Sequence, residues 1–308
     1  MFFHSLFLYV YATYIGFLRF SLYINFTKGY SVSMTLRLRN RFLRVFVAGT
    51  SLAAAAVLIA FVFLFFSGGL SSLRTLPRAI DFSFKSALFE YNLYVSIVSL
   101  ILLMLFVPAS GIFLISTFEK TQSPEVIYYA GFLAGCFLQT IRLSIPLFDL
   151  WIGYSSFLVF TARANFAGQI ICALCLWFAS FFSDEDSVQE ADRNLAIALA
   201  TAVLFSLFIP VNPATLNSAF LLSSGYKFLF ELIFIILFLV SFFAFIIRGK
   251  QRNMISCMRI AVLFLVFFTG YRILSLSDSL FTLITGSGLL YTGSFLFLNT
   301  LHKYYLWK

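Results

Sequence analysis

Charged side chains and histidine are scarce in this sequence, and their scarcity excludes several classes of protein. Only 11% of its 308 residues are Asp, Glu, Lys or Arg, against roughly 25% in soluble domains. A chain with so few charges cannot cover a large apolar core with polar surface, which excludes a soluble globular protein. The two histidines, His4 and His302, lie near opposite ends of the chain, so we expect no histidine-based metal site or catalytic base.

The sequence motifs of common enzyme classes are also missing. The chain contains no Walker-type phosphate loop, no His-Glu-x-x-His zinc motif and no Gly-x-Ser-x-Gly nucleophile elbow. Three of the four cysteines, Cys136, Cys172 and Cys175, lie in apolar segments, and Cys257 lies in a basic loop, so no exported disulfide framework is expected. Cys172-x-x-Cys175 resembles a redox motif, but its apolar surroundings disfavour a reactive thiolate, and we interpret both residues as small packing residues. We therefore expect neither a cofactor nor an enzymatic activity.

Long apolar runs dominate the sequence instead. Hydrophobic residues make up 61% of the chain, including 43 phenylalanines, and they form runs of about 20 residues, the length that an α-helix needs to cross a bilayer. These runs predict an all-α fold, a polytopic bundle of about eight transmembrane helices in a lipid bilayer. The predicted spans are residues 45–66, 91–117, 124–148, 157–182, 195–210, 227–247, 259–277 and 280–301.

The positions of the basic residues predict how the bundle is oriented. Under the positive-inside rule, the loops with most Lys and Arg face the cytoplasm, which places both ends of the bundle inside. Anionic lipid headgroups explain the net charge of +9 better than nucleic acid does, and we expect a bacterial inner membrane. The predicted inside residues are Arg37, Arg39, Arg41, Arg44, Lys120, Arg193, Arg248, Lys250, Arg252, Arg259, Lys303 and Lys308, and the outside residues are mainly Arg74, Arg78, Lys85 and Lys227.

Two segments leave alternatives open. Residues 1–33 are either an N-terminal extension before a start at Met34 or an extra apolar span, whereas residues 34–308 form a single transmembrane domain. Residues 149–182 are long for one crossing and short for two. One crossing after an interfacial segment keeps the basic loop at residues 248–252 inside, so we favour it.

Helix signals lie at two positions within this framework. Pro108 lies inside the second predicted span, where it should kink the helix. Before the third span, Ser123 can cap a helix, Pro124 suits its first position and Glu125 suits its positive end. The third helix is therefore predicted to begin at Pro124.

Several ionisable residues lie at or within the predicted spans. A charged side chain in a bilayer is costly unless it is paired, hydrated or able to reach the headgroups, so each is a candidate functional residue. In the predicted orientation they all fall in the outer third of the membrane. They are Arg142, Asp149, Arg163, Glu231, Arg272 and Asp278.

The third predicted span concentrates small and polar residues on one face. At about 100° per residue, Gly131, Gly135, Gln139 and Arg142 fall within an arc of about 80°. The two glycines allow a neighbouring helix to approach closely, so this face should pack against protein. Arg142 is therefore expected to face protein or a water-filled cavity and not lipid.

These residues support a hypothesis for a binding site. In it, Gln139, Arg142, Glu231 and Arg272 line a polar pocket that opens outward, with the arginines as anion ligands and Glu231 as their counter-charge. The alternative is structural: ion pairs such as Lys227–Glu231, four residues apart on one helix, together with side chains that extend to the headgroups.

One segment resembles a known pattern. FEKTQSPEVIYY, residues 118–129, followed by a span that ends in Gln139-x-x-Arg142, resembles a pattern in uncharacterised bacterial multi-span membrane proteins. The span count and short loops also resemble the membrane portion of bacterial seven-helix sensors. Those sensors carry an extracellular ligand domain and a cytoplasmic output domain, which these 308 residues lack, so the resemblance implies a signalling partner.

Three functions are compatible with these observations. The first is a sensor or transducer that reads the outer pocket and acts through a cytoplasmic partner. The second is a permease for a small anion or amphiphile, although the sequence lacks the inverted repeats of many transporters. The third is a structural subunit of a membrane complex, in which the embedded charges are assembly contacts. We rank the sensor first.

Overall fold

The computed structural model describes most of the chain from residue 36 onward, namely residues 36–67, 88–121, 123–148, 150, 155–181, 191–251 and 255–306. The chain divides into two compact units, Met1–Ser33 and Met34–Lys308. Every described residue belongs to the second unit. The prediction of an extension or extra span in residues 1–33 and the predicted interfacial segment around Trp151 therefore lie outside the described residues.

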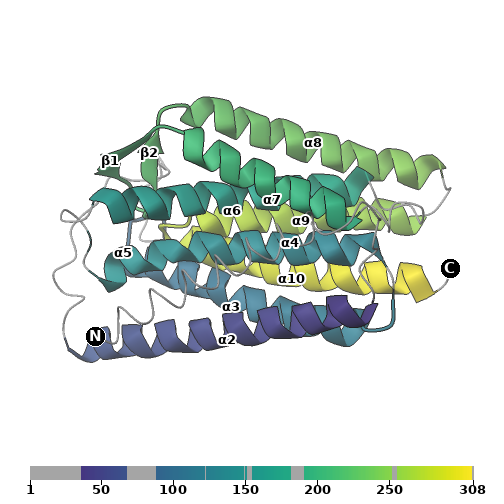
Figure 1. Cartoon of the computed structure of the whole chain (residues 1–308), viewed down its shortest axis with the longest axis horizontal. Helices are drawn as coiled ribbons and strands as arrows, with labels where there is room; N and C mark the ends of the chain where they lie inside the picture. Colours follow the sequence, from purple (N-terminus) through teal and green to yellow (C-terminus); the bar gives the residue numbers. More distant parts are fainter. Residues whose placement is uncertain are drawn as a thin grey trace, which may run out of the picture. The chain divides into compact units, whose positions relative to one another are not determined.

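The second unit is a bundle of apolar helices (Figure 1), and the predicted all-α fold is confirmed. Eight helices of the described part are long and apolar enough to cross a membrane, counting the run from α4 to α5 as one, and they indicate an integral membrane protein. The elements are α2 (Leu36–Phe66), α3 (Leu93–Phe118), α4 (Pro124–Gln139), the 3-10 turn η2 (Thr140–Leu143), α5 (Ser144–Leu147), α6 (Ser155–Phe181), α7 (Ala191–Phe208), β1 (Val211–Leu216), β2 (Leu222–Ser224), α8 (Lys227–Gln251), α9 (Ile255–Ser275) and α10 (Leu280–Leu306).

The helix boundaries follow the apolar runs, with some local differences. The first described helix begins at Leu36, so the arginines before the predicted span continue the helix. Residues 155–181 form one continuous helix, α6. The helix after Ser123 begins at Pro124 with Ser123 at its N-cap position, as predicted, but the Ser123 side chain does not cap the helix. The Ser123 hydroxyl donates to Glu125 Oε2 at 2.9 Å and accepts no backbone N–H of the helix.

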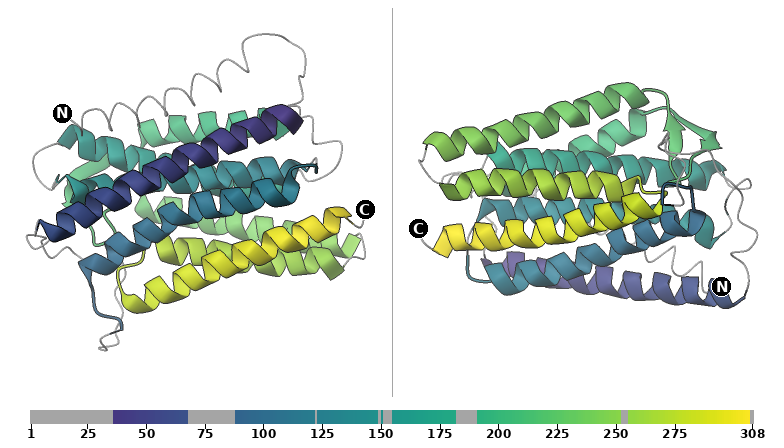
Figure 2. Two further views of the ribbon diagram at one scale, coloured as in Figure 1. Left: turned by 90° about the horizontal axis from the view of Figure 1, so that it is seen from below. Right: turned by 180° about the vertical axis from the view of Figure 1, so that it is seen from behind.

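The helices differ in how deeply they are enclosed. Most of α3, α4 and α6 is buried inside the bundle, whereas α2 and α8 lie on its margin and expose most of their apolar side chains (Figure 2). In a membrane protein such exposed faces contact lipid tails. The central helices are therefore the ones that can hold polar residues away from lipid.

The α4–α6 crossing is close because glycines face each other there. A Cβ atom on Gly135 would lie 2.7 Å from the Gly168 carbonyl oxygen, and one on Gly168 would lie 2.6 Å from the Gly135 carbonyl oxygen. Small residues permit such backbone contact between membrane helices. Helices α9 and α10, which lie side by side in Figure 1, also meet backbone to backbone, at Gly286 and Gly293.

The chain between α7 and α8 forms a β-hairpin that the sequence analysis did not predict. Strands β1 and β2 are antiparallel, with Val211 opposite Ser224 and Leu216 opposite Leu222. We call residues 217–221 the loop tip, and the end of the bundle that carries this hairpin the hairpin end. The hairpin end also holds the beginnings of α3 and α10 and the ends of α5 and α9 (Figure 1).

Backbone and side-chain hydrogen bonds of Asn217 give the loop tip its shape. The Leu221 N–H donates to Asn217 Oδ1 at 2.8 Å, and the Phe220 N–H donates to the Asn217 carbonyl at 3.0 Å. Phe220 has a φ of 56°, a left-handed conformation that is unfavourable for a bulky residue. Its side chain is fully buried and packs in an apolar cluster with residues such as Leu143 and Leu158. The loop tip is thus inserted between the helices.

Candidate functional site

Arg142 lies at the hairpin end, where α4 tightens into the turn η2, and only 1% of the residue is exposed. Its Nε donates to the Gln139 carbonyl at 3.0 Å. Its Nη1 donates to the carbonyls of Ala219 at 3.0 Å and Ser275 at 3.2 Å, and Nη2 donates to Ser275 Oγ at 3.2 Å. One side chain therefore connects the end of α4, the loop tip and the end of α9.

Gln139 connects the same helices through a second set of hydrogen bonds. Its Nε2 donates to the Tyr271 hydroxyl at 2.6 Å, and its Oε1 accepts a hydrogen bond from Ser275 Oγ at 3.1 Å. Both Gln139 and Tyr271 are buried. We call Gln139, Arg142, Tyr271 and Ser275 the polar junction, because together they join α4 to α9.

The surroundings of Arg142 explain how a buried cation is tolerated. Ser275 is the last residue of α9, and carbonyls at the C-terminal end of a helix lack intrahelical partners and carry partial negative charge, whereas Gln139 lies where α4 tightens into η2. The guanidinium uses these carbonyls as acceptors. Among the described residues, its burial is thus balanced by the carbonyls of Gln139, of the end of α9 and of the loop tip, and by no carboxylate.

Asp278 is the second buried charge at this end, in the link between α9 and α10, and it is 2% exposed. Its Oδ2 accepts a hydrogen bond from Ser218 Oγ at 2.8 Å, and its backbone carbonyl accepts one from the Asn92 N–H at 3.0 Å. Ser218 is the neighbour of Ala219 in the loop tip. Arg142 and Asp278 therefore hold two consecutive residues of one loop.

Among the described residues, neither buried charge forms a direct ion pair. Within the part of the chain that the structure describes, no group of opposite charge lies within 4.0 Å of Arg142 or of Asp278. Ion pairs elsewhere in the described part include Arg44–Glu119 at 2.5 Å and Lys227–Glu231 at 3.9 Å. The loop tip is thus the neutral element to which both charges bind.

Of the four residues of the hypothetical pocket, Arg272 follows Tyr271 of the polar junction in the chain and lies close enough to Arg142 for the two charges to interact. Gln139 and Arg142 are in contact in the polar junction. Glu231 is half exposed and pairs with Lys227 along α8, and the Arg272 guanidinium lies 5.4 Å from the centre of the Phe234 ring. Among the described residues, Glu231 therefore pairs with Lys227 and is not the counter-charge of Arg142, which donates to carbonyls. Asp149 lies outside the described residues.

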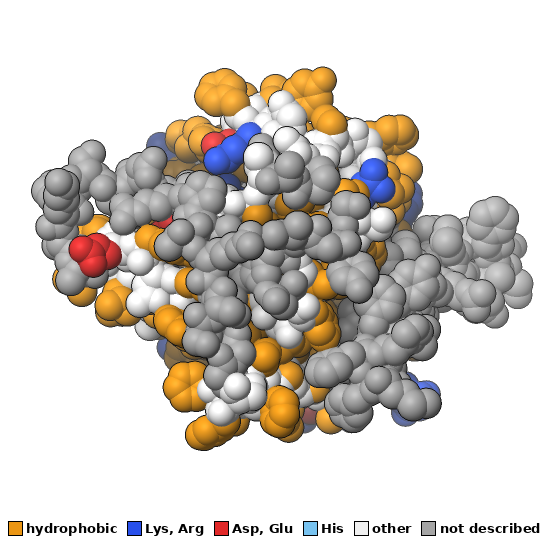
Figure 3. Space-filling view, turned by 90° about the vertical axis from the view of Figure 1, so that its left-hand side faces the viewer, with side chains coloured by type: hydrophobic (Ala, Val, Ile, Leu, Met, Phe, Trp, Pro, Cys, Tyr) orange, Lys and Arg blue, Asp and Glu red, His pale blue; other side chains and the backbone are white. Residues whose placement is uncertain are grey.

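The view onto the hairpin end is dominated by apolar and neutral atoms among the side chains that it describes (Figure 3). Of the described side chains visible in this view, few are charged. A crevice between α6, α8 and α9, lined by residues such as Phe234, Phe268 and Ser241, is too narrow to hold a water molecule. It offers no second polar site comparable to the junction.

Gly131 and Gly135 lie against α6, where cysteines fill the interface. A Cβ on Gly131 would lie 2.5 Å from Cys175 Sγ, and one on Gly135 would lie 2.6 Å from Cys172 Sγ. Cys172 Sγ lies 3.5 Å from Gln139 Nε2 and donates to a carbonyl of α4. These thiols occupy the space that the glycines leave, as expected of packing residues.

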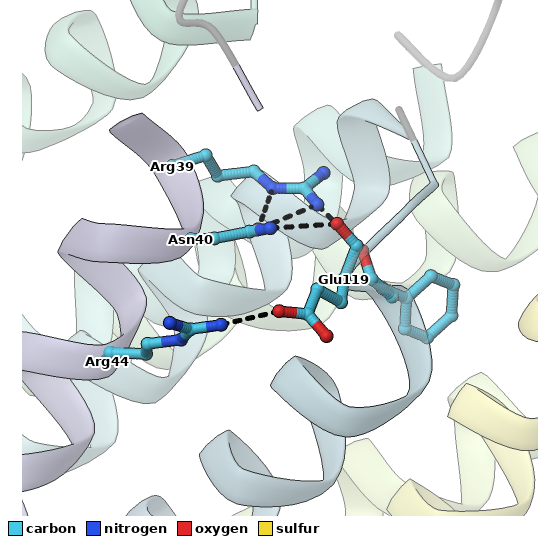
Figure 4. A network of polar contacts seen from close by, with 5 residues as sticks. Arg39, Asn40, Arg44 and Glu119 are labelled. Atoms are coloured by element: carbon cyan, nitrogen blue, oxygen red, sulfur yellow. Dashed lines mark hydrogen bonds and ion pairs between the residues drawn. The ribbon is translucent and has the colours of Figure 1, made fainter. Parts of the chain in front are cut away.

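A second arginine binds helix-end carbonyls at the opposite end of the bundle (Figure 4). Arg39 of α2 is 6% exposed and donates to the carbonyls of Phe118 at 2.7 Å and Thr121 at 2.8 Å, at the end of α3. Beside it, Asn40 Nδ2 donates to the Glu119 carbonyl at 2.8 Å, and the exposed Arg44 pairs with the Glu119 carboxylate. Arginine and helix-end carbonyls therefore meet at both ends.

Sequence reasoning missed Tyr271, Ser275 and the loop tip as parts of this site. The dipeptide Asn212-Pro213 after α7 is a turn signal, but the structure places it within strand β1, so it does not mark the loop tip. Comparison with models of known protein families finds no match to the chain, and comparison with characterised proteins finds no significant match.

Proposed function

We propose that the protein is a sensor or transducer module of a bacterial cytoplasmic membrane, with the hairpin end outside and a cytoplasmic partner at the opposite end. The observation that carries the proposal is the contact of Arg142 with α4, α9 and the loop tip at once. A change in the conformation of the loop tip would therefore act directly on the ends of α4 and α9.

The predicted orientation supports ligand sensing at the outer face of the membrane, where the hairpin end would lie. Basic residues gather at the end opposite the hairpin, among them Arg37, Arg41, Arg193 and Lys303, and the positive-inside rule places that end in the cytoplasm. The run Pro124–Leu147 is about 36 Å long at 1.5 Å per residue, enough to cross the roughly 30 Å hydrocarbon core. A shift at Arg142 can therefore reach the cytoplasmic side through a single continuous run.

Tight packing supports transmission along the helices. Because backbones touch at Gly135 and Gly168, α4 cannot move at the hairpin end without moving against α6. The turn from α3 to α4 lies at the other end, beside Arg39 and its carbonyl partners. We assign this turn, residues 119–125, as the cytoplasmic output surface.

Coupling between the two ends is the test of this proposal. Hydrogen exchange is measured on the full chain in lipid nanodiscs, for the wild type and for Ser275→Ala, which removes one hydroxyl from the polar junction. We expect faster exchange both in residues 217–221 and in residues 119–125. The control is Ser287→Ala on α10, whose hydroxyl bonds only carbonyls of its own helix and which should change neither region. A change confined to the hairpin end would refute transduction and favour a structural subunit.

A permease, the alternative function, requires water to reach the junction. Cys172 reports on this because its thiol lies next to Gln139. In a variant that keeps Cys172 as the sole cysteine, a membrane-impermeant anionic methanethiosulfonate should leave the thiol unmodified in intact cells. Rapid modification from outside would establish a water-filled path and would favour transport over transduction.

A further inference from the structure

We infer that the loop tip occupies the binding site of a small zwitterion that carries an oxyanion and a primary ammonium group. This inference rests on the proposed function, because it names the ligand class that the sensor would read. In the ligand-bound state the oxyanion takes the place of the Ala219 carbonyl on Arg142. The ammonium takes the place of the Ser218 hydroxyl on Asp278.

The two ligating groups are complementary to such a molecule. The Arg142 guanidinium donates hydrogen bonds to oxygen, and its planar fork suits carboxylate or phosphate. The Asp278 carboxylate only accepts, and at present it receives the Ser218 O–H. In each present hydrogen bond only the Arg142 or Asp278 side chain is charged, so a ligand group of opposite charge would add an ion pair at each position.

The spacing of the two groups suits a small molecule. Ser218 and Ala219 are consecutive, and consecutive Cα atoms are about 3.8 Å apart. Groups that hold these two residues are within reach of one compact ligand, such as an amino acid or phosphoethanolamine. The glycerophospholipid headgroup of phosphatidylethanolamine carries the same two charges.

The loop tip has features of a displaceable occupant. It is connected to the bundle by a two-stranded hairpin, and such hairpins are marginally stable alone. Phe220 is held in a left-handed backbone conformation, so withdrawal of the loop relieves strain at that residue. By contrast, Arg142 and Asp278 sit beside the tightly packed α4–α6 and α9–α10 contacts and would remain in place.

The experiment is hydrogen exchange of residues 217–221 in the full wild-type chain, in nanodiscs of phosphatidylcholine and phosphatidylglycerol. Phosphoethanolamine and glycine are the soluble probes, and inorganic phosphate, methylammonium and phosphocholine are the controls. We expect at least one zwitterion with a primary ammonium to accelerate exchange saturably, at a concentration about tenfold below any control. No acceleration by either probe, or equal potency of inorganic phosphate, would overturn the inference for a soluble ligand.

A second arm distinguishes the lipid as the source. Nanodiscs that contain phosphatidylethanolamine should show fast loop exchange without any soluble probe if the headgroup is the ligand. Fast exchange there supports the same site with a lipid ligand. Slow exchange in these nanodiscs, together with no response to the soluble probes, would refute the site altogether.

Variants of the loop and of its ligands should change affinity in opposite directions. Ser218→Ala removes the group that competes for Asp278 and should tighten zwitterion binding about tenfold, whereas Asp278→Asn should weaken it by at least as much. Glu90→Gln, an exposed acid at the same end, is the matched control and should change nothing. Unchanged or weaker binding in Ser218→Ala would contradict displacement of the loop.

The two proposals fail separately. If a zwitterion accelerates loop exchange but residues 119–125 do not respond, the site stands and transduction falls. If Ser275→Ala couples the two ends while no zwitterion acts on the loop, transduction stands and the ligand assignment falls.

Discussion

At the scale of single residues, a buried arginine in this protein is balanced by backbone carbonyls at both ends of the bundle. Arg142 and Arg39 each bind carbonyls at the end of another helix, whereas the carboxylate-paired Arg44 is exposed. Carbonyls of helix ends need partners in a membrane, because lipid supplies no hydrogen-bond donor. Each buried arginine thus donates hydrogen bonds to helix-end carbonyls that would otherwise lack a donor.

This difference predicts unequal effects of two substitutions in the network of Figure 4. Arg39→Ala leaves two buried or partly buried carbonyls unsatisfied and should lower stability by about 2–3 kcal/mol. Arg44→Ala breaks an exposed ion pair and should cost less than about 1 kcal/mol. Thermal unfolding in detergent measures both. Equal losses of stability in the two variants would contradict a larger contribution from the carbonyl contacts of Arg39 than from the exposed ion pair.

Phe220 allows a test of backbone strain in the loop tip. Phe220→Ala and Phe220→Gly both remove the buried ring, but glycine adopts a positive φ without penalty. The glycine variant should therefore be more stable than the alanine variant by about 1 kcal/mol. Thermal unfolding of the two variants in the same detergent gives this difference. An alanine variant as stable as the glycine variant would show that the left-handed conformation carries no strain.

The buried location of Arg142 could be anticipated from its sequence, but its partners could not. The spacing of Gly131, Gly135, Gln139 and Arg142 indicates a protein-facing stripe, because side chains three and four residues apart share a helix face. The acceptors of Arg142 are mostly main-chain carbonyls, which every residue has. Nothing in the identity of Ala219 marks it as a partner.

At the scale of elements, glycine contacts decide which helices can move independently. Gly135→Ala places a methyl group against the Gly168 carbonyl, which is backbone and cannot rotate away, so we expect a loss of about 1–3 kcal/mol. Gly288→Ala on α10 meets nothing within 4 Å and should be neutral or stabilising, because alanine favours helix. Thermal unfolding of the two alanine variants measures the contrast. Equal tolerance of both would contradict a close α4–α6 crossing.

The helices were predictable to within a few residues at most boundaries, whereas the hairpin was not. A membrane-crossing helix requires about 20 apolar residues in a row, and this signal is strong for α3, α8 and α10. Strand β2 has three residues and β1 contains Pro213, so neither shows a period-two pattern long enough to recognise. The position of the loop tip depends on contacts with helices that are distant in the sequence, and no local pattern predicts these contacts.

At the scale of the whole molecule, orientation is the property that the charge pattern predicts and that experiment can settle directly. In a cysteine-free background, Glu90→Cys at the hairpin end should react with an impermeant maleimide in intact cells. Lys120→Cys at the opposite end should react only after the membrane is opened. Both positions are exposed, so accessibility does not limit the reaction. The reverse pattern would place the hairpin in the cytoplasm and would remove the basis for outside reception.

The contacts of Arg142 also have a consequence for the order in which the molecule is assembled. Its partners lie 77 and 133 residues later in the chain, so they emerge from the ribosome well after α4. The helices from α2 to α8 are synthesised before Ser275 exists to accept a bond. During synthesis Arg142 therefore lacks its acceptors on α9, and the polar junction is completed only when α9 has been made. A chain that stops after α8 would therefore hold a buried arginine with fewer hydrogen-bond acceptors than the finished protein gives it.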